Sequence, residues 1–150
     1  MSDTKAPDYK SGLAQLETTL EDFFGKKAPA LPENVKDSLV SFAPYLAIIG
    51  VIISVAGLLP LLGLGAMMGP WAASFGITYY VGAVGIVISA IFDGLAVSGL
   101  FKKSLSAWRL LFYGSLVNAV ASVIQGNIVG ALLGAAISLY FLFQVKSKYK

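Results

Sequence analysis

Four long apolar segments constrain this chain more than any other feature. They run from 39 to 64, 72 to 100, 107 to 124 and 128 to 145, and each reaches the roughly 17 to 25 residues that a helix needs to cross the hydrocarbon core of a bilayer. The whole chain is 57% hydrophobic and 13% charged, with a mean hydropathy of +0.77. We therefore predict an all-α polytopic membrane protein, with four transmembrane helices packed as a bundle over residues 38–150.

Turn-forming residues separate the segments. Those in the first connection are Pro60, Gly63, Gly65, Gly69 and Pro70, and those in the last are Gln125, Gly126 and Asn127. The last two segments are the shortest, and a re-entrant hairpin would return the chain to the same side as two full spans. Full spans are favoured, because irregular backbone in lipid leaves polar groups without hydrogen bonds.

The cations alternate along the chain. They occur in the N-terminal tail (Lys5, Lys10, Lys26, Lys27, Lys36), between the second and third segments (Lys102, Lys103, Arg109) and in the C-terminal tail (Lys146, Lys148, Lys150). Under the positive-inside rule this pattern predicts that both termini face the cytoplasm. The cations form separate groups and no basic stripe interleaved with aromatic residues, so nucleic-acid binding is excluded.

Residues 1–37 form a segment of a different character. Five apolar residues recur at steps of three and four and predict a cytoplasmic amphipathic helix over about 12–25, with one apolar face: Leu13, Leu16, Leu20, Phe23 and Phe24. Gly25 is expected to end it, and a proline-containing linker leads to the first span. Its polar face is acidic (Glu17, Glu21, Asp22), which disfavours attraction to an anionic leaflet. We therefore predict that the apolar face binds a protein partner.

Small residues recur at three- and four-residue steps in the spans. The stripes include Gly50, Ser54 and Gly57 in the first segment, Gly82, Gly85 and Ser89 in the second, and Gly126, Gly130 and Gly134 along the fourth. Small residues at this spacing let helix backbones approach closely in lipid. The stripes predict a close-packed bundle. The fourth stripe fits packing within the chain or against a second copy.

Asp93 is an acidic residue within an apolar segment. It shares a helical face with Gly82, Gly85 and Ser89, and folding the second and third segments about their basic loop brings Ser115 and Asn118 to a similar depth, with Arg109 nearer the surface. These three are its predicted partners. Three interpretations stay open: a structural hydrogen-bonding role, a turn at Asp93–Gly94, or an ion or proton site.

The residues that most enzymes use are absent. The chain has no cysteine and no histidine, which excludes disulfides, thiol nucleophiles, imidazole bases and the commonest zinc and haem ligands. We expect no catalytic, cofactor or metal site, and the chain is not predicted to be an enzyme.

The C-terminal part carries a resemblance. The stretch from Trp108, "WRLLFYGSLVNAVASVIQGNIVGALLGAAISLYFLFQVKSKYK", resembles the C-terminal hairpin of small uncharacterised bacterial four-span membrane proteins. The resemblance covers under a third of the chain. It implies a helical hairpin in a bacterial cytoplasmic (inner) membrane and no activity.

Two functions fit these patterns. The first is a scaffold or accessory subunit of a membrane complex, which acts by helix packing and by binding a membrane-protein partner or further copies of itself within the lipid bilayer. The alternative is a small transporter or channel subunit, in which an oligomer aligns copies of Asp93, Ser115 and Asn118 around a pathway.

Overall fold

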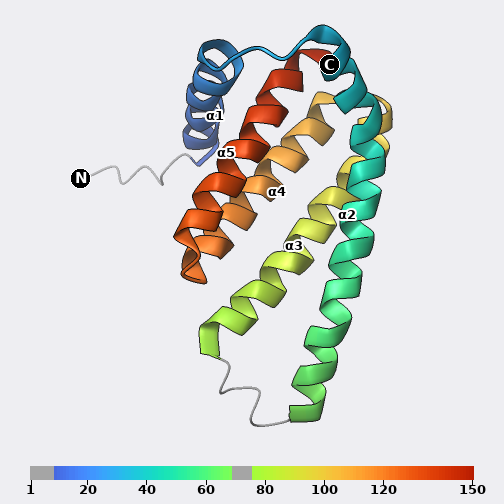
Figure 1. Ribbon diagram of the computed structural model, residues 1–150, viewed down its shortest axis with the longest axis vertical. Helices are drawn as coiled ribbons and strands as arrows, with labels where there is room; N and C mark the ends of the chain where they lie inside the picture. Colours follow the sequence, from blue (N-terminus) through green and yellow to red (C-terminus); the bar gives the residue numbers. More distant parts are fainter. Residues whose placement is uncertain (1–8, 69–75) are drawn as a thin grey trace, which may run out of the picture.

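The computed structural model describes residues 9–68 and 76–150, and this part of the chain is helical without strands (Figure 1). The elements are α1 (Tyr9–Leu20), η1 (Glu21–Lys27), α2 (Glu33–Met68), α3 (Gly76–Phe101), α4 (Leu105–Ile124), α5 (Ile128–Val145) and η3 (Lys146–Lys148). In the described residues, α2 to α5 are each long and apolar enough to cross a membrane. The prediction of an all-helical chain with four such helices is confirmed.

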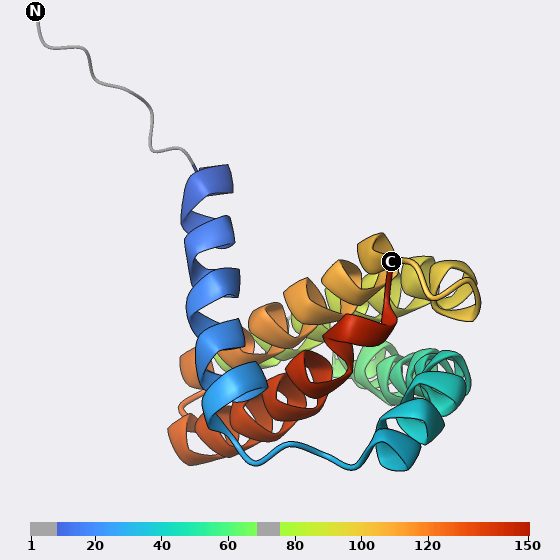
Figure 2. The same cartoon turned by 90° about the horizontal axis from the view of Figure 1, so that it is seen from above.

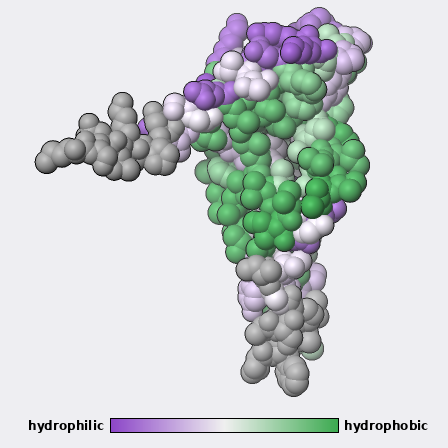
Figure 3. All heavy atoms as spheres, turned by 90° about the vertical axis from the view of Figure 1, so that its left-hand side faces the viewer, coloured by the Kyte–Doolittle hydropathy of each residue, from purple (hydrophilic) through white to green (hydrophobic). Residues whose placement is uncertain are grey.

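Each long helix packs against the next one in sequence, so α2, α3, α4 and α5 form successive antiparallel neighbours (Figure 1). The start of α2 and the end of α5 lie at the same end, where Lys148 contacts Glu33. We call this the polar end, and the opposite end the far end. In Figure 3 hydrophilic residues cover the polar end, and an apolar band lies next to it. α2 and α5 share far fewer contacts than consecutive helices do, so the bundle is less closed along that side.

The buried core lies mainly in the half of the bundle nearer the polar end, which we call the polar half. Trp108 and Phe112 of α4 have no exposed surface (0%) and stack with ring centroids 5.6 Å apart. Phe143 of α5 meets both rings edge-on, and the Trp108 indole N–H donates to the Leu142 carbonyl at 2.7 Å. Ala121 and Ala131 are the buried apolar side chains nearest the far end. Large aromatic residues therefore fill the polar half, and the buried indole N–H of Trp108 has a hydrogen-bond partner there.

Two tight connections join α3, α4 and α5. After α3 the Ser104 amide donates to the Gly99 carbonyl at 2.8 Å, and Lys103 adopts a positive φ of 53°. The C-terminal Lys150 closes this turn by exchanging two backbone hydrogen bonds with Lys103 and Leu105. Between α4 and α5, Gly126 has a φ of +82°, which glycine adopts without strain. The turn predicted at 125–127 is confirmed.

Three of the residues predicted to lie in the first connection belong to the helix before it, so their predicted placement is wrong. Pro60, Gly63 and Gly65 lie inside α2, which has 36 residues and also contains Pro44. Proline is tolerated inside membrane helices because neighbouring groups can satisfy the freed backbone carbonyl. At about 1.5 Å per residue, these 36 residues give α2 a length of about 54 Å. The other two predicted breakers, Gly69 and Pro70, lie outside the described residues.

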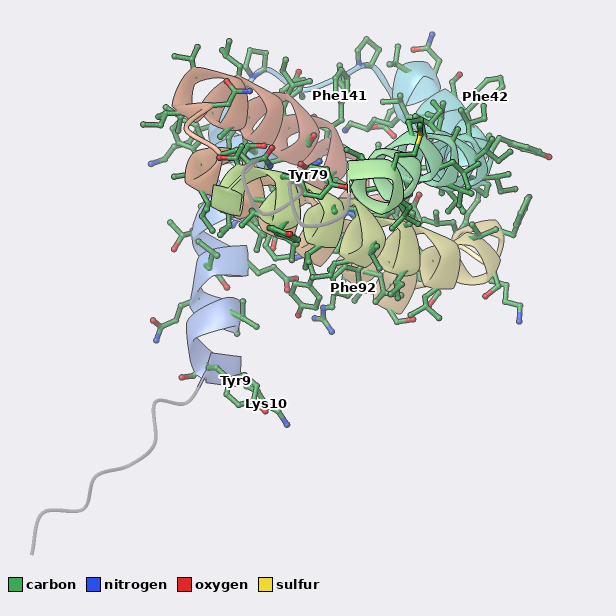
Figure 4. All side chains as sticks on the ribbon, turned by 90° about the horizontal axis from the view of Figure 1, so that it is seen from below. Tyr9, Lys10, Phe42, Tyr79, Phe92 and Phe141 are labelled. Atoms are coloured by element: carbon green, nitrogen blue, oxygen red, sulfur yellow. The ribbon has the colours of Figure 1, made fainter. Side chains whose placement is uncertain are left out.

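The N-terminal helix is longer than predicted and does not end at Gly25. α1 continues into η1, a π-helix that ends with the Ala28 amide donating to the Phe23 carbonyl, five residues back, at 2.9 Å. Extended backbone follows, and α2 begins at Glu33. In Figure 2, α1 projects sideways from the bundle. Tyr9 and Lys10 lie at its free end (Figure 4).

Candidate functional site

Asp93 lies inside α3, which continues unbroken to Phe101. The predicted turn at Asp93–Gly94 is therefore wrong, and the remaining interpretations place the carboxylate on a helix face. Asp93 is half-buried. One of its carboxylate oxygens, Oδ2, lies 3.4 Å from the point where Gly50 of α2 would carry a Cβ atom. A Cβ at that distance would make an ordinary contact, so α2 passes beside the carboxylate at van der Waals separation.

Two cavities meet at Asp93. The one towards the far end has a volume of about 310 Å³ and a partly polar lining: Ser89, Asp93, Ser115, Asn118 and Ser138, with Leu111, Gly114 and Leu142. The one towards the polar end has a volume of about 280 Å³ and is lined by apolar residues and Tyr149 besides Asp93. Asp93, Leu111 and Leu142 line both cavities. The carboxylate thus lies at the junction between a polar and an apolar space.

The three predicted partners of Asp93 lie in two different places. Ser115 and Asn118 share its polar cavity, and Ser115 donates to the Phe112 carbonyl of its own helix at 2.8 Å. Arg109 lies at the polar end instead, with Nε 3.5 Å from Glu17 Oε2. Within the described residues, the Asp93 side chain has no hydrogen bond and no ion pair. The cavity offers it hydroxyl and amide groups, but no cation.

These groups define what the cavity can bind. A carboxylate, three hydroxyls and one amide supply several hydrogen-bond acceptors around one space. Within the described residues no group of three or more metal-ligating acids is found. A space of about 310 Å³ also has room for several water molecules.

A second polar arrangement attaches the N-terminal helix to the bundle. Lys146 Nζ lies 2.8 Å from Glu17 and 2.6 Å from Glu21, and 5.0 Å from the centroid of the Trp108 ring. Glu17, Glu21, Arg109 and Lys146 are the ionic cluster. The Glu17 and Lys146 side chains are only 11% and 18% exposed, so solvent screens this pair less than a surface pair. The sequence places Glu17 on the polar face of the helix, but in the structure Glu17 faces the bundle.

Gln144 of α5 holds the chain that follows. Its amide nitrogen donates to the Phe24 carbonyl at 2.8 Å, and its amide oxygen accepts from the Leu31 amide at 3.0 Å. The Tyr140 hydroxyl donates to the Pro29 carbonyl at 2.7 Å. By contrast, the exposed Lys26 side chain hydrogen-bonds Asp22, four residues earlier in the same helix. This bond lowers the pKa of the Asp22 carboxyl below its ordinary value. The last turns of α5 thus fix the path of residues 24–31.

The predicted partner-binding face is divided. Leu20 and Phe24 pack against the chain's own core, whereas Leu16 and Phe23 are 39% and 58% exposed. Leu13 is half-buried. Part of the apolar face is therefore used within the molecule, and Leu16 and Phe23 are left outside.

The small-residue stripes also have different surroundings. A Cβ at Gly85 would lie 3.2 Å from the Ala121 Cβ, and one at Gly82 would lie 3.4 Å from the Gln125 side chain, so the α3 stripe contacts α4. Ser89 lines the Asp93 cavity, and Ser54 is half-buried. Gly57 and Gly134 face open space, Gly126 forms the turn, and Gly130 donates its amide to Asn127.

Several residues of both arrangements have no signal in the sequence. Gln144 and Lys146 each contact groups more than one hundred residues away in the chain. Gly99 is a close-approach position, because a Cβ on it would lie 2.6 Å from the Ala107 Cβ, whereas a Cβ on Gly114 would make an ordinary contact with Phe92 at 3.5 Å. Ala96 and Gly99 continue the α3 stripe beyond Asp93 at three-residue steps, and this spacing is the sequence signal for Gly99.

Comparison of the chain with protein-family models, curated proteins and solved structures finds no match.

Proposed function

We propose that this protein is a small integral membrane protein that acts as a scaffold or accessory subunit by binding a partner at the polar end of its bundle. The supporting observation is the placement of α1. The ionic cluster and Gln144 tie its C-terminal end to the bundle, while Leu16 and Phe23 stay exposed. A helix held at one end and apolar on an open edge is suited to helix-in-groove recognition.

The proposed orientation places the polar end in the cytoplasm of a bacterial cell. The lysines at that end and the absence of charge between α4 and α5 support this under the positive-inside rule. Because the chain has no cysteine, single cysteines can report the topology. We expect a membrane-impermeant maleimide added outside intact cells to label Asn127→Cys and not Ser106→Cys. Equal labelling of the two would contradict the proposed orientation.

The partner contact is best tested by point substitutions. Deleting residues 1–31 would also remove the groups that Lys146 and Gln144 bind, so a loss of binding would have two causes. A photo-crosslinking residue, benzoylphenylalanine, at position 23 is expected to give a discrete protein adduct in native membranes. The same residue at Thr19, which is also exposed, is the matched control and is expected to give none. Adducts with lipid alone at position 23 would contradict a protein partner.

A second candidate, a transporter or channel subunit, is favoured by the cavities around Asp93. A third cavity of about 160 Å³ between α4 and α5 shares Ser115, Asn118 and Ser138 with the polar cavity. Together the three spaces follow the bundle from Tyr149 to Gly130. Flux of cations into liposomes by the wild type, lost in Asp93→Asn, would support this candidate. Absence of flux in correctly folded wild type would remove it.

A further inference from the structure

We propose that the two cavities that meet at Asp93 bind a small organic ammonium ion with an apolar chain. The ammonium group lies at the Asp93 carboxylate, and the chain extends into the apolar cavity. This proposal goes beyond the partner contact of α1, and it holds whether or not the ligand is moved across the membrane.

Among the described residues, the polar cavity contains a carboxylate and no cation to pair with it. Asp93 is the one ionisable residue lining either cavity besides Tyr149, and it has no ion pair in the described residues. A carboxylate in a low-dielectric site is stabilised by a cation or by several hydrogen-bond donors. A primary ammonium supplies a positive charge and three N–H donors at once. The side-chain oxygens of Ser89, Asn118 and Ser138 can accept hydrogen bonds from the ammonium N–H groups that do not bond the carboxylate.

The apolar cavity selects what the ammonium carries. Apart from Asp93 and the ring of Tyr149, its lining is aliphatic or aromatic and comes from α2, α4 and α5: Leu39, Ala43, Leu46, Ala47, Leu111, Phe141, Leu142 and Val145. Its volume of about 280 Å³ exceeds that of an eight-carbon alkyl chain. An inorganic cation would leave this space without a complementary group.

Other occupants fit less well. Calcium takes about six to eight oxygen ligands, usually with several carboxylates, and this cavity has one carboxylate. A second copy of the chain has no free cation to offer at this depth, because Arg109, the cation within α4, contacts Glu17. A neutral lipid tail would fill the apolar cavity but leave the carboxylate unpaired.

The side between α2 and α5 gives such a ligand a way in. These two helices contact each other least among the neighbouring pairs, and Phe141 lies in the gap between them, 41% exposed (Figure 4). Phe92, in contrast, lies on the other side of α3 against Gly114 (Figure 4). An amphiphile dissolved in the bilayer would therefore reach Asp93 from the side, past Phe141.

The test uses the full chain in lipid nanodiscs and a hydrophobic carbodiimide, which forms a stable adduct with a carboxyl group inside a membrane. Peptide mass spectrometry measures the rate of modification at Asp93. We expect n-octyltrimethylammonium, which carries the charge but has no nucleophilic nitrogen to couple to the activated carboxyl, to slow this rate at least tenfold. n-Octanol, which has the same chain and no charge, is expected to slow it less than twofold. Equal protection by both compounds, or protection by neither, would overturn the proposal.

A binding measurement gives a second test. Radiolabelled octylammonium is expected to bind wild-type nanodiscs in excess of empty ones, and Asp93→Asn, which keeps the side-chain shape, is expected to lose this excess at least tenfold. Ser106→Ala, at an exposed position near the polar end, is the matched control and should bind like the wild type. Unchanged binding by Asp93→Asn would contradict the site. If that variant does not fold, the protection experiment on the wild type still decides. Neither result depends on crosslinking at Phe23.

Discussion

The two halves of the bundle differ in how their helices are held together. In the polar half, Trp108, Phe112 and Phe143 form a buried aromatic core, and the ionic cluster and Gln144 attach α1 and the linker to it. Towards the far end the contacts involve small residues such as Gly85 and Ala121, and polar cavities remain. In lipid, apolar surface alone does not drive helices together, so shape and polar contacts decide where a bundle closes. In this chain, close-fitting side chains and polar contacts between helices occur mainly in the polar half.

The largest expected difference between the halves comes from removing a large side chain. Trp108→Ala should lower the free energy of unfolding by about 3 to 5 kcal/mol, because it leaves a cavity in the core and removes the bond to the Leu142 carbonyl. Leu132→Ala, at a site on α5 that is 66% exposed, should change it by less than about 0.5 kcal/mol. Reversible unfolding in mixed micelles measures both. Similar losses for the two variants would contradict the difference in packing.

The ionic cluster gives the next largest effect. Lys146→Met removes the shared partner of Glu17 and Glu21 and should cost about 2 kcal/mol, less than a fully buried pair because Glu21 is 40% exposed. It should also release α1, so trypsin should cleave at Lys26 and Lys27 faster. Lys148→Met is the matched control: its partners Glu33 and Asp37 are mostly exposed, and cleavage should hardly change. Unchanged cleavage in Lys146→Met would show that the cluster does not hold the helix.

Glycine substitutions should give the smallest effects, with opposite signs in the two halves. A Cβ at Gly99 would lie 2.6 Å from Ala107, so Gly99→Ala should push α3 and α4 apart and cost about 1 kcal/mol. Gly134 faces open space, so Gly134→Ala should stabilise the fold by up to about 1 kcal/mol through helix propensity. Thermal unfolding in detergent gives the sign of each change. A loss of stability in Gly134→Ala would indicate a helix contact at that face.

Local patterns in the sequence were sufficient for the elements. Hydropathy and length predict the four long helices, and the turn chemistry of Gly126 and Asn127 predicts the last connection. The same local reasoning fails at Pro60 and Asp93, where turn-forming residues lie inside α2 and α3. Proline, aspartate and glycine favour turns where water can hydrogen-bond the freed backbone groups. In a long apolar segment every backbone group needs a partner within the protein, which favours a continued helix.

The side-chain partners were harder to predict because they depend on contacts distant in sequence. Folding two helices about one loop places Ser115 and Asn118 beside the same cavity as Asp93. The contact between Arg109 and Glu17 cannot be predicted in this way, because it requires the N-terminal segment to fold back over α4 and α5. For the same reason Glu17 reads as solvent-facing from its spacing alone, although it is buried.

Cysteine accessibility tests the central difference most directly, because a thiol reacts with a polar reagent only where water reaches it. Single cysteines at Ala96 and Ala107, which are 0% and 2% exposed, represent the buried core of the polar half. Cysteines at Asn118 and Ser138 represent the polar cavities beyond Asp93. We predict that a small charged methanethiosulfonate reagent modifies Asn118→Cys and Ser138→Cys at least tenfold faster than the other two in nanodiscs. Equal rates at all four positions would contradict the difference between the buried core of the polar half and the polar cavities beyond Asp93.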